Sequence, residues 1–126
     1  MEVKVERAHY KLDLWMKSVD LVVEVYNLTS SFPEAEKFGL IPQIRRTAVS
    51  IPSNIAEGAA RETKKEFNKF LSIAQGSASE LETQFIICER LKYIDNSTLE
   101  AVLSKTADIT RMIVGLKKSL RGERKR

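Results

Sequence analysis

The stretch FNKFLSIAQGSASELETQFIIC, residues 67–88, carries one apolar line whose members alternate in spacing between four and three residues. This spacing follows one face of an α-helix, because 3.6 residues complete a helical turn. Directly before it, Thr63 and Glu66 form a capping box, which predicts the start of the helix. The line consists of Phe67, Leu71, Ala74, Ala78, Leu81, Phe85 and Cys88. We therefore predict a long helix with one buried face, in which Cys88 acts as a small apolar residue.

Three further segments show the same helical period, and no segment alternates convincingly like a β-strand. The segment 40–59 has a core line of Leu40, Ile44, Ala48, Ile51, Ile55 and Ala59. The last segment opens with a second predicted capping box, Ser97 to Glu100. Its core line is Leu99, Val102, Thr106, Ile109, Ile113, Leu116 and Leu120. The segment 12–28 has two lines, namely Leu12, Trp15, Val19, Val22 and Tyr26, and beside them Leu14, Leu21, Val25 and Leu28.

The connections between these segments are short, so consecutive helices are expected to be antiparallel neighbours. We predict an all-α fold, an antiparallel up-down-up-down four-helix bundle, as a single domain over residues 1–126. The second apolar line of the first helix exceeds what a lone bundle needs. We expect Leu14, Leu21, Val25 and Leu28 to leave exposed surface in a lone bundle, which association into a homo-oligomer would cover; a broad contact within the chain is the alternative.

Composition narrows the classes of function. The 126 residues are 30% charged and 43% hydrophobic, which is typical of a folded soluble domain. No apolar run is long enough for a membrane span, and the first residues lack a signal-peptide pattern, so we expect a cytoplasmic protein. One cysteine, Cys88, and one histidine, His9, give neither a disulfide nor the usual zinc site. We expect no metal, no cofactor and no enzymatic activity.

The positive charge is concentrated at the C-terminal end. The tail 117–126 carries a net charge of +5, whereas the whole chain carries +4. Such a tail can neutralise the phosphates of a nucleic acid, or it can interact favourably with the C-terminal dipole of the last helix. The composition of the tail leaves both interpretations open.

A polar line borders the core line of the segment 40–59. It consists of Gln43, Arg46, Ser50, Asn54, Glu57 and Arg61, and the next helix carries a counterpart of Ser77, Glu80 and Gln84. We predict a structural network of hydrogen bonds formed by Ser50, Asn54, Glu57, Ser77 and Glu80. A partner-binding site is the alternative, while catalysis by Ser50 or Glu57 lacks a partner histidine. Pro52 is expected to kink the helix or to start a new segment, and Gly58 and Gly76 to permit close backbone approach.

The motifs Ser50-Ile-Pro-Ser-Asn-Ile-Ala-Glu-Gly58 and Gly76-Ser-Ala-Ser-Glu-Leu-Glu82 resemble the bacterial four-helix-bundle proteins named for the intervening sequences of 23S ribosomal RNA genes. Gln43-Ile-Arg-Arg46, Phe32-Pro33 and Leu14-Trp15 extend the resemblance over nearly the whole chain. Ala59-Ala60 departs from it, since members often have an aromatic residue there.

The resemblance implies a four-helix bundle, commonly a ring-shaped homopentamer, with no established enzymatic activity. It also implies a distant similarity to the accessory protein of diversity-generating retroelements, a basic pentameric bundle that binds nucleic acid.

Two functions follow as expectations. The first is a homo-oligomer, a pentamer by resemblance, that binds RNA or DNA through basic residues. These residues are Arg45, Arg46, Arg61, Lys64, Lys65, Lys117, Lys118, Arg121, Arg124, Lys125 and Arg126. The alternative is a scaffold or adaptor for a partner protein, without direct binding of nucleic acid.

Overall fold

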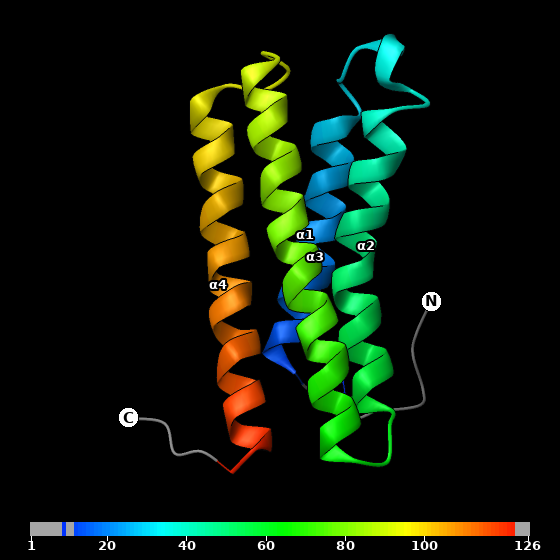
Figure 1. Cartoon of the computed structure of the whole chain (residues 1–126). Helices are drawn as coiled ribbons and strands as arrows, with labels where there is room; N and C mark the ends of the chain where they lie inside the picture. Colours follow the sequence, from blue (N-terminus) through cyan, green and yellow to red (C-terminus); the bar gives the residue numbers. More distant parts are fainter. Residues whose placement is uncertain (1–8, 10–11, 123–126) are drawn as a thin grey trace.

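The computed structural model describes residue 9 and residues 12–122, and this part of the chain contains four long helices and no strand (Figure 1). The helices are α1 (Asp13–Thr29), α2 (Leu40–Ala59), α3 (Lys64–Arg90) and α4 (Asn96–Leu120). A short 3-10 helix, η2 (Glu34–Glu36), lies in the connection between α1 and α2. The predicted all-helical fold with four helices is confirmed.

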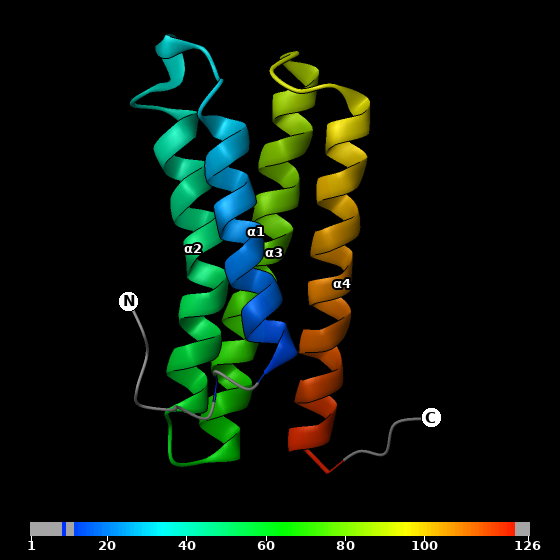
Figure 2. The same ribbon diagram turned by 180° about the vertical axis from the view of Figure 1, so that it is seen from behind.

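The four helices lie side by side around one core. Each helix begins at the end of the molecule where the preceding helix stops (Figures 1 and 2). α1 packs against α2 and α4, and α3 packs against the same two helices. Each helix therefore has two neighbours, and the contact between α2 and α3 is the most extensive.

The apolar lines predicted for the second, third and fourth helices form most of the core. In α3, every member of the line from Leu71 to Cys88 is fully buried, and Phe67 is half-buried. In α2, the residues from Ile44 to Ile55 on the predicted line are fully buried. Pro52 is also buried, and α2 continues through it, so of the two predicted effects of this proline, a kink or a new helical segment, the second does not occur.

The expectation for the two apolar lines of α1 was also wrong. Leu14, Leu21 and Val25 are core residues, and Leu28 is half-buried. In the line from Leu12 to Tyr26, the first four residues are half-buried and Tyr26 is 42% exposed. The buried face of α1 includes the polar residues Ser18 and Thr29, so the spacing of apolar residues alone does not identify this face in the sequence. Their hydroxyl groups donate hydrogen bonds to carbonyl oxygens of their own helix at 2.8 Å, so both can be buried without loss.

The helix starts agree with one of the two predicted capping boxes. Thr63 Oγ1 accepts a hydrogen bond from the backbone N–H of Glu66 at 3.1 Å, as predicted for α3. α4, in contrast, is capped by Asp95, whose carboxylate accepts from the N–H of Thr98 at 2.7 Å. The prediction that Ser97 caps this helix was wrong, because the carboxylate two residues earlier already satisfies that end.

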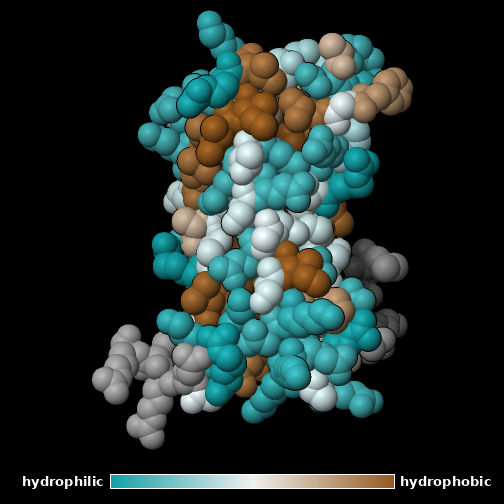
Figure 3. Space-filling model, in the orientation of Figure 1, coloured by the Kyte–Doolittle hydropathy of each residue, from teal (hydrophilic) through white to brown (hydrophobic). Residues whose placement is uncertain are grey.

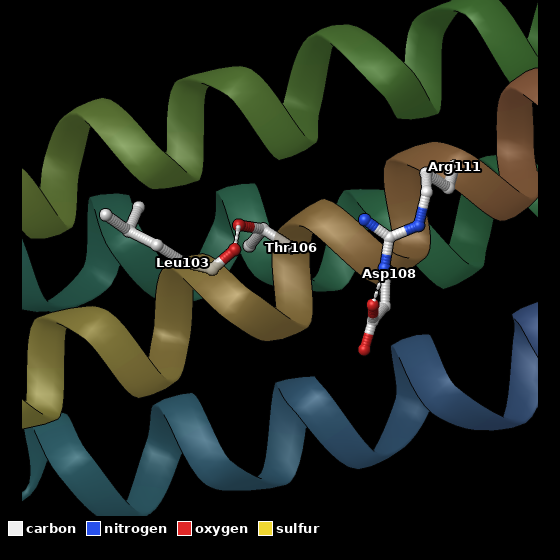
Figure 4. A network of polar contacts seen from close by, with 4 residues as sticks. All are labelled: Leu103, Thr106, Asp108 and Arg111. Carbon is white, nitrogen blue, oxygen red and sulfur yellow. Dashed lines mark hydrogen bonds and ion pairs between the residues drawn. The ribbon is translucent and has the colours of Figure 1, made fainter.

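One polar side chain on the core face of α4 pairs with α3. Thr106 is fully buried, and its Oγ1 lies 3.0 Å from the Leu103 carbonyl oxygen and 2.6 Å from Glu82 Oε2. Figure 4 shows the Thr106 side chain directed back at Leu103, whereas Asp108 and Arg111 pair with each other one turn further on. Thr106 therefore joins the two helices at a core position without an unpaired hydroxyl.

Gly58 of α2 lies directly against Phe67 and Phe70 of α3. A Cβ atom at this position would lie 2.8 Å from Phe70 Cβ and 2.9 Å from Phe67 Cδ1, distances that side chains do not tolerate. Gly76 was expected to serve the same purpose, but a Cβ atom there would meet nothing within 4 Å. Within the chain, close approach therefore depends on Gly58 and not on Gly76, while a role of Gly76 in a contact between subunits stays a prediction.

The substitution Gly58→Ala is expected to lower the free energy of unfolding by about 1–3 kcal/mol, because α2 and α3 must move apart. The matched substitution Gly76→Ala is expected to raise it by up to about 1 kcal/mol, since alanine favours a helix and has room here. Denaturant unfolding followed by circular dichroism measures both. Changes of the same sign in the two variants would contradict this account.

The two connections at the end opposite Gly58 are tied together by Glu36. Its Oε2 accepts a hydrogen bond from the Tyr93 hydroxyl at 2.7 Å, and its Oε1 accepts from the backbone N–H of Leu40 at 3.2 Å. This carboxylate also raises the pKa of Tyr93, chiefly through the hydrogen bond. Burial, and secondarily the charge of Glu36, raises the pKa of the Cys88 thiol from 9.0 to about 11.

The raised pKa of Cys88 predicts a loss of stability in alkali. Between pH 9 and pH 11 the unfolded chain releases the thiol proton while the folded chain retains it, so the free energy of unfolding falls as pH rises. The variant Cys88→Ala lacks this contribution, which amounts to about 2 kcal/mol. Denaturant unfolding at pH 8 and pH 11 under reducing conditions measures the difference. An identical pH dependence in both proteins would refute the assignment.

Candidate nucleic-acid interface

The end of the bundle where α3 begins and α4 stops gathers basic residues that lie far apart in the sequence (Figure 1). A hollow of about 650 Å³ is lined by Lys64, Lys65, Glu66, Asn68 and Lys69 of α3 and by Leu120 and Arg121 of α4. We call the surface formed by this hollow and its flanks the basic end. Its basic residues are Arg61, Lys64, Lys65, Lys69, Lys117, Lys118 and Arg121.

Two hydrogen bonds hold the last turns of α4 against α3. Asn68 Nδ2 donates to the Lys117 carbonyl oxygen at 3.0 Å, and Lys117 Nζ donates to Gln75 Oε1 at 3.2 Å. The Lys117 carbonyl oxygen also accepts from the backbone N–H of Arg121 at 3.2 Å, so the bond from Asn68 adds a second donor and links α3 to this turn of α4. The position of Arg121 beside Lys64 and Lys65 is therefore fixed by packing between helices.

The positive charges of Lys64 and Lys65 interact unfavourably with the dipole of α3. They occupy the first turn of α3, at the positive end of the helix dipole, where a cation costs about 0.3–1 kcal/mol. Glu66 lies in the same turn and offsets part of this charge, so the first turn of α3 keeps a net charge of +1 beside the positive end of the dipole, which attracts anions. Lys117 and Lys118 lie in the last turn of α4, where a cation stabilises the helix, so they carry less information about function.

Arg61 lies in the connection between α2 and α3. Its guanidinium pairs with Glu57 Oε1 at 2.9 Å and lies 4.9 Å from the ring centre of Phe70. Both contacts restrict its rotamers while the side chain stays 42% exposed. Lys69 belongs to the same surface and was missed in the sequence, although its position one turn after Lys65 is a signal that could have revealed it.

The remaining predicted basic residues do not join this surface. Arg45 and Arg46 line a separate groove of about 900 Å³ between α1, the η2 connection and α2. Arg124, Lys125 and Arg126 lie outside the residues that the structure describes.

The polar line of α2 is bonded mainly to its own helix. Ser50 Oγ donates to the Thr47 carbonyl oxygen at 2.7 Å, and Asn54 Nδ2 donates to the Ser50 carbonyl oxygen at 2.7 Å. Glu57 pairs with Arg61, one turn further along. Ser77 is half-buried on α3.

A different set of side chains forms the polar contact between α2 and α3. Gln84 Nε2 donates to Thr47 Oγ1 at 3.0 Å and to Glu80 Oε2 at 3.3 Å, and Thr47 Oγ1 lies 3.3 Å from the same carboxylate oxygen. Among the five residues predicted for the network, Glu80 takes part in this contact. Thr47 was missed because its position falls beside both the apolar and the polar line, so its burial depends on how α2 is rotated.

The described residues offer neither a metal centre nor a membrane span. Within residues 9 and 12–122, no three His, Cys, Asp or Glu side chains are grouped so that they could hold a metal ion. In the same part of the chain, none of the helices combines the length and the apolar composition that crossing a bilayer requires.

Comparison with known proteins places this fold in a family. A solved structure from Bacteroides thetaiotaomicron, described as a protein with unknown function from the S23 ribosomal protein family, is similar over 83% of this chain and 98% of that chain. The TM-score is 0.75 and the sequence identity 25%. No curated protein matches the chain. The profile of one family matches residues 10–115, and the chain therefore belongs to the 23S rRNA-intervening sequence protein family.

Proposed function

We propose that this protein is a non-enzymatic, oligomeric helical bundle that binds nucleic acid through its basic end. One observation carries the proposal: Lys64, Lys65 and Lys69 share a hollow with Arg121, although these residues come from two helices. Cations on one surface release condensed counterions when they bind phosphates, which is the main source of affinity in sequence-independent binding.

The family supports RNA as the nucleic acid to examine first. The family is named for intervening sequences of 23S rRNA genes, and the solved relative is described as a protein with unknown function from the S23 ribosomal protein family, so these names direct the first test to RNA without describing a ligand. The distant resemblance to the accessory protein of diversity-generating retroelements supports the same class of ligand. We expect the protein to act in the cytoplasm, where RNA is accessible.

Oligomerisation is part of the proposal, because one basic end with so few cations binds weakly. An antiparallel up-down-up-down bundle that assembles as a ring would present several basic ends to one nucleic acid, which multiplies their effect by avidity. Apolar side chains at the opposite end of the bundle are available for contacts between subunits. Ile86 and Ile87 in the last turns of α3 and Leu91 directly after it are 40–48% exposed, and Figure 3 shows apolar surface gathered at this end.

The same apolar side chains favour one alternative. A scaffold or adaptor would use Ile86, Ile87 and Leu91 to bind a different protein, and its basic end would serve only solubility. This alternative predicts a stable complex with a partner protein in the absence of nucleic acid.

The double substitution Lys64→Gln and Lys65→Gln is expected to weaken binding to single-stranded RNA about 10-fold or more at 0.1 M salt, irrespective of sequence. The slope of log affinity against log salt should become shallower by about 1.4, since each lost phosphate contact contributes about 0.7. Fluorescence anisotropy of labelled RNA over a salt series measures both quantities.

The matched control, Arg90→Gln with Lys92→Gln, removes the same charge from exposed positions at the opposite end of the bundle. We expect it to change affinity less than 3-fold. Equal losses in the two variants would mean that net charge rather than the basic end determines binding.

The association state provides a separate prediction. Light scattering is expected to give a mass that is a multiple of the 14.3 kDa chain mass, and five times that mass for a pentamer. The mass should persist on dilution to the concentrations used for binding. A mass of one chain at all concentrations would rule out the ring and the avidity it supplies.

A further inference from the structure

The groove between α1 and α2 combines cations with aromatic rings. It has a volume of about 900 Å³, and its lining includes Tyr26, Lys37, Arg45 and Arg46, with Ile41 and Val49 among its apolar residues. Three cations face a single carboxylate, that of Glu34, so the lining carries a net positive charge.

The arrangement of Arg45 is fixed from α1. Its Nε donates to Thr29 Oγ1 at 2.9 Å, its Nη2 donates to the Tyr26 carbonyl oxygen at 3.3 Å, and its guanidinium lies 4.4 Å from the centre of the Tyr26 ring. Thr29 is fully buried and in turn bonded to its own helix, so the anchor of Arg45 is rigid. The Arg45 guanidinium therefore already lies over the Tyr26 ring in the absence of a ligand, and both groups line the groove.

A second pair of a cation and a ring lies in the adjacent connection. Lys37 Nζ lies 5.7 Å from the centre of the Phe38 ring, and Phe38 is 90% exposed. Alternating cations and exposed rings are typical of surfaces that bind single-stranded nucleic acid, where phosphates meet the cations and bases stack on rings or guanidinium planes. An acidic peptide would satisfy the cations but would make no use of the planar groups.

We infer that this groove binds an unpaired base of a single-stranded nucleic acid, with the Tyr26–Arg45 pair as the stacking surface. This inference rests on the proposed function and adds to it a preference for single strands. Arg46, exposed at the rim, contacts the neighbouring phosphate. The polar line of α2 leads from Arg46 to Arg61 at the basic end, a distance of about 22 Å along the helix, so one strand can contact both sites.

The substitution Tyr26→Ala tests the groove. Anisotropy with a labelled 12-nucleotide single-stranded RNA should reveal a loss of affinity of about 5-fold or more, the effect expected when one stacked base loses its platform. Affinity for an RNA duplex of the same length should change less than 2-fold, and the salt slope should stay as in wild type. Tyr26→Phe keeps the ring and should bind as wild type does.

Two further variants separate stacking from charge and guard against misfolding. Arg46→Gln should make the salt slope for the single strand shallower by about 0.7. Phe38→Ala removes a side chain that is almost fully exposed, so the fold is retained, and it should weaken binding of the single strand more than binding of the duplex. Val23→Ala, on an exposed position of α1 outside the groove, is the matched control and should change neither.

The outcomes that overturn the inference differ from those that overturn the proposed function. If Tyr26→Ala and Phe38→Ala affect single strand and duplex equally, or affect neither, while Lys64→Gln with Lys65→Gln weakens both, the groove inference falls and the proposed function stands. If a polyglutamate peptide displaces the single strand from wild type and binds Tyr26→Ala less tightly, the groove is a peptide site and the inference also falls. A wild-type protein that binds neither form of RNA overturns both.

Discussion

The close packing of α2 against α3 at the basic end depends on the absence of a side chain at Gly58. Phe67 and Phe70 of α3 occupy the space that a Cβ atom at this position would need, so the last turns of α2 and the first turns of α3 pack backbone against ring. The connection between the two helices can therefore be short, and Arg61 lies close enough for its guanidinium to stack on Phe70. A larger residue would separate the helices at the place where the lysines of α3 begin.

Charge placement distinguishes cations that stabilise a helix from cations that do not. Lys117 and Lys118 interact favourably with the C-terminal end of α4. Lys64 and Lys65 do not stabilise α3 through its dipole, because they lie at its positive end. The stability of α3 therefore does not explain the two positive charges at its start.

The sequence predicted the helices and most of the core because both follow from local periodicity. It erred where a polar side chain takes a core position. Ser18 and Thr29 are buried on α1 because their hydroxyl groups bond within the helix, so the apolar line that looked superfluous is the one that packs inside. Asp95 replaced Ser97 as the cap of α4 for a similar reason, since two suitable residues lay close together and only one geometry could form.

By itself, the sequence determined the helical class, the number of helices, the buried faces of α2, α3 and α4, and the positive charge of residues 61–65 and 117–121. Only the tertiary structure decided that Lys64 and Lys65 meet Arg121 at one hollow, while Arg45 and Arg46 line another groove beside Tyr26. Periodicity assigns residues to the face of one helix, but it does not give the rotation and height of that helix against its neighbours. Those two quantities are set by packing, here by Gly58 and by the bond from Asn68 to the end of α4.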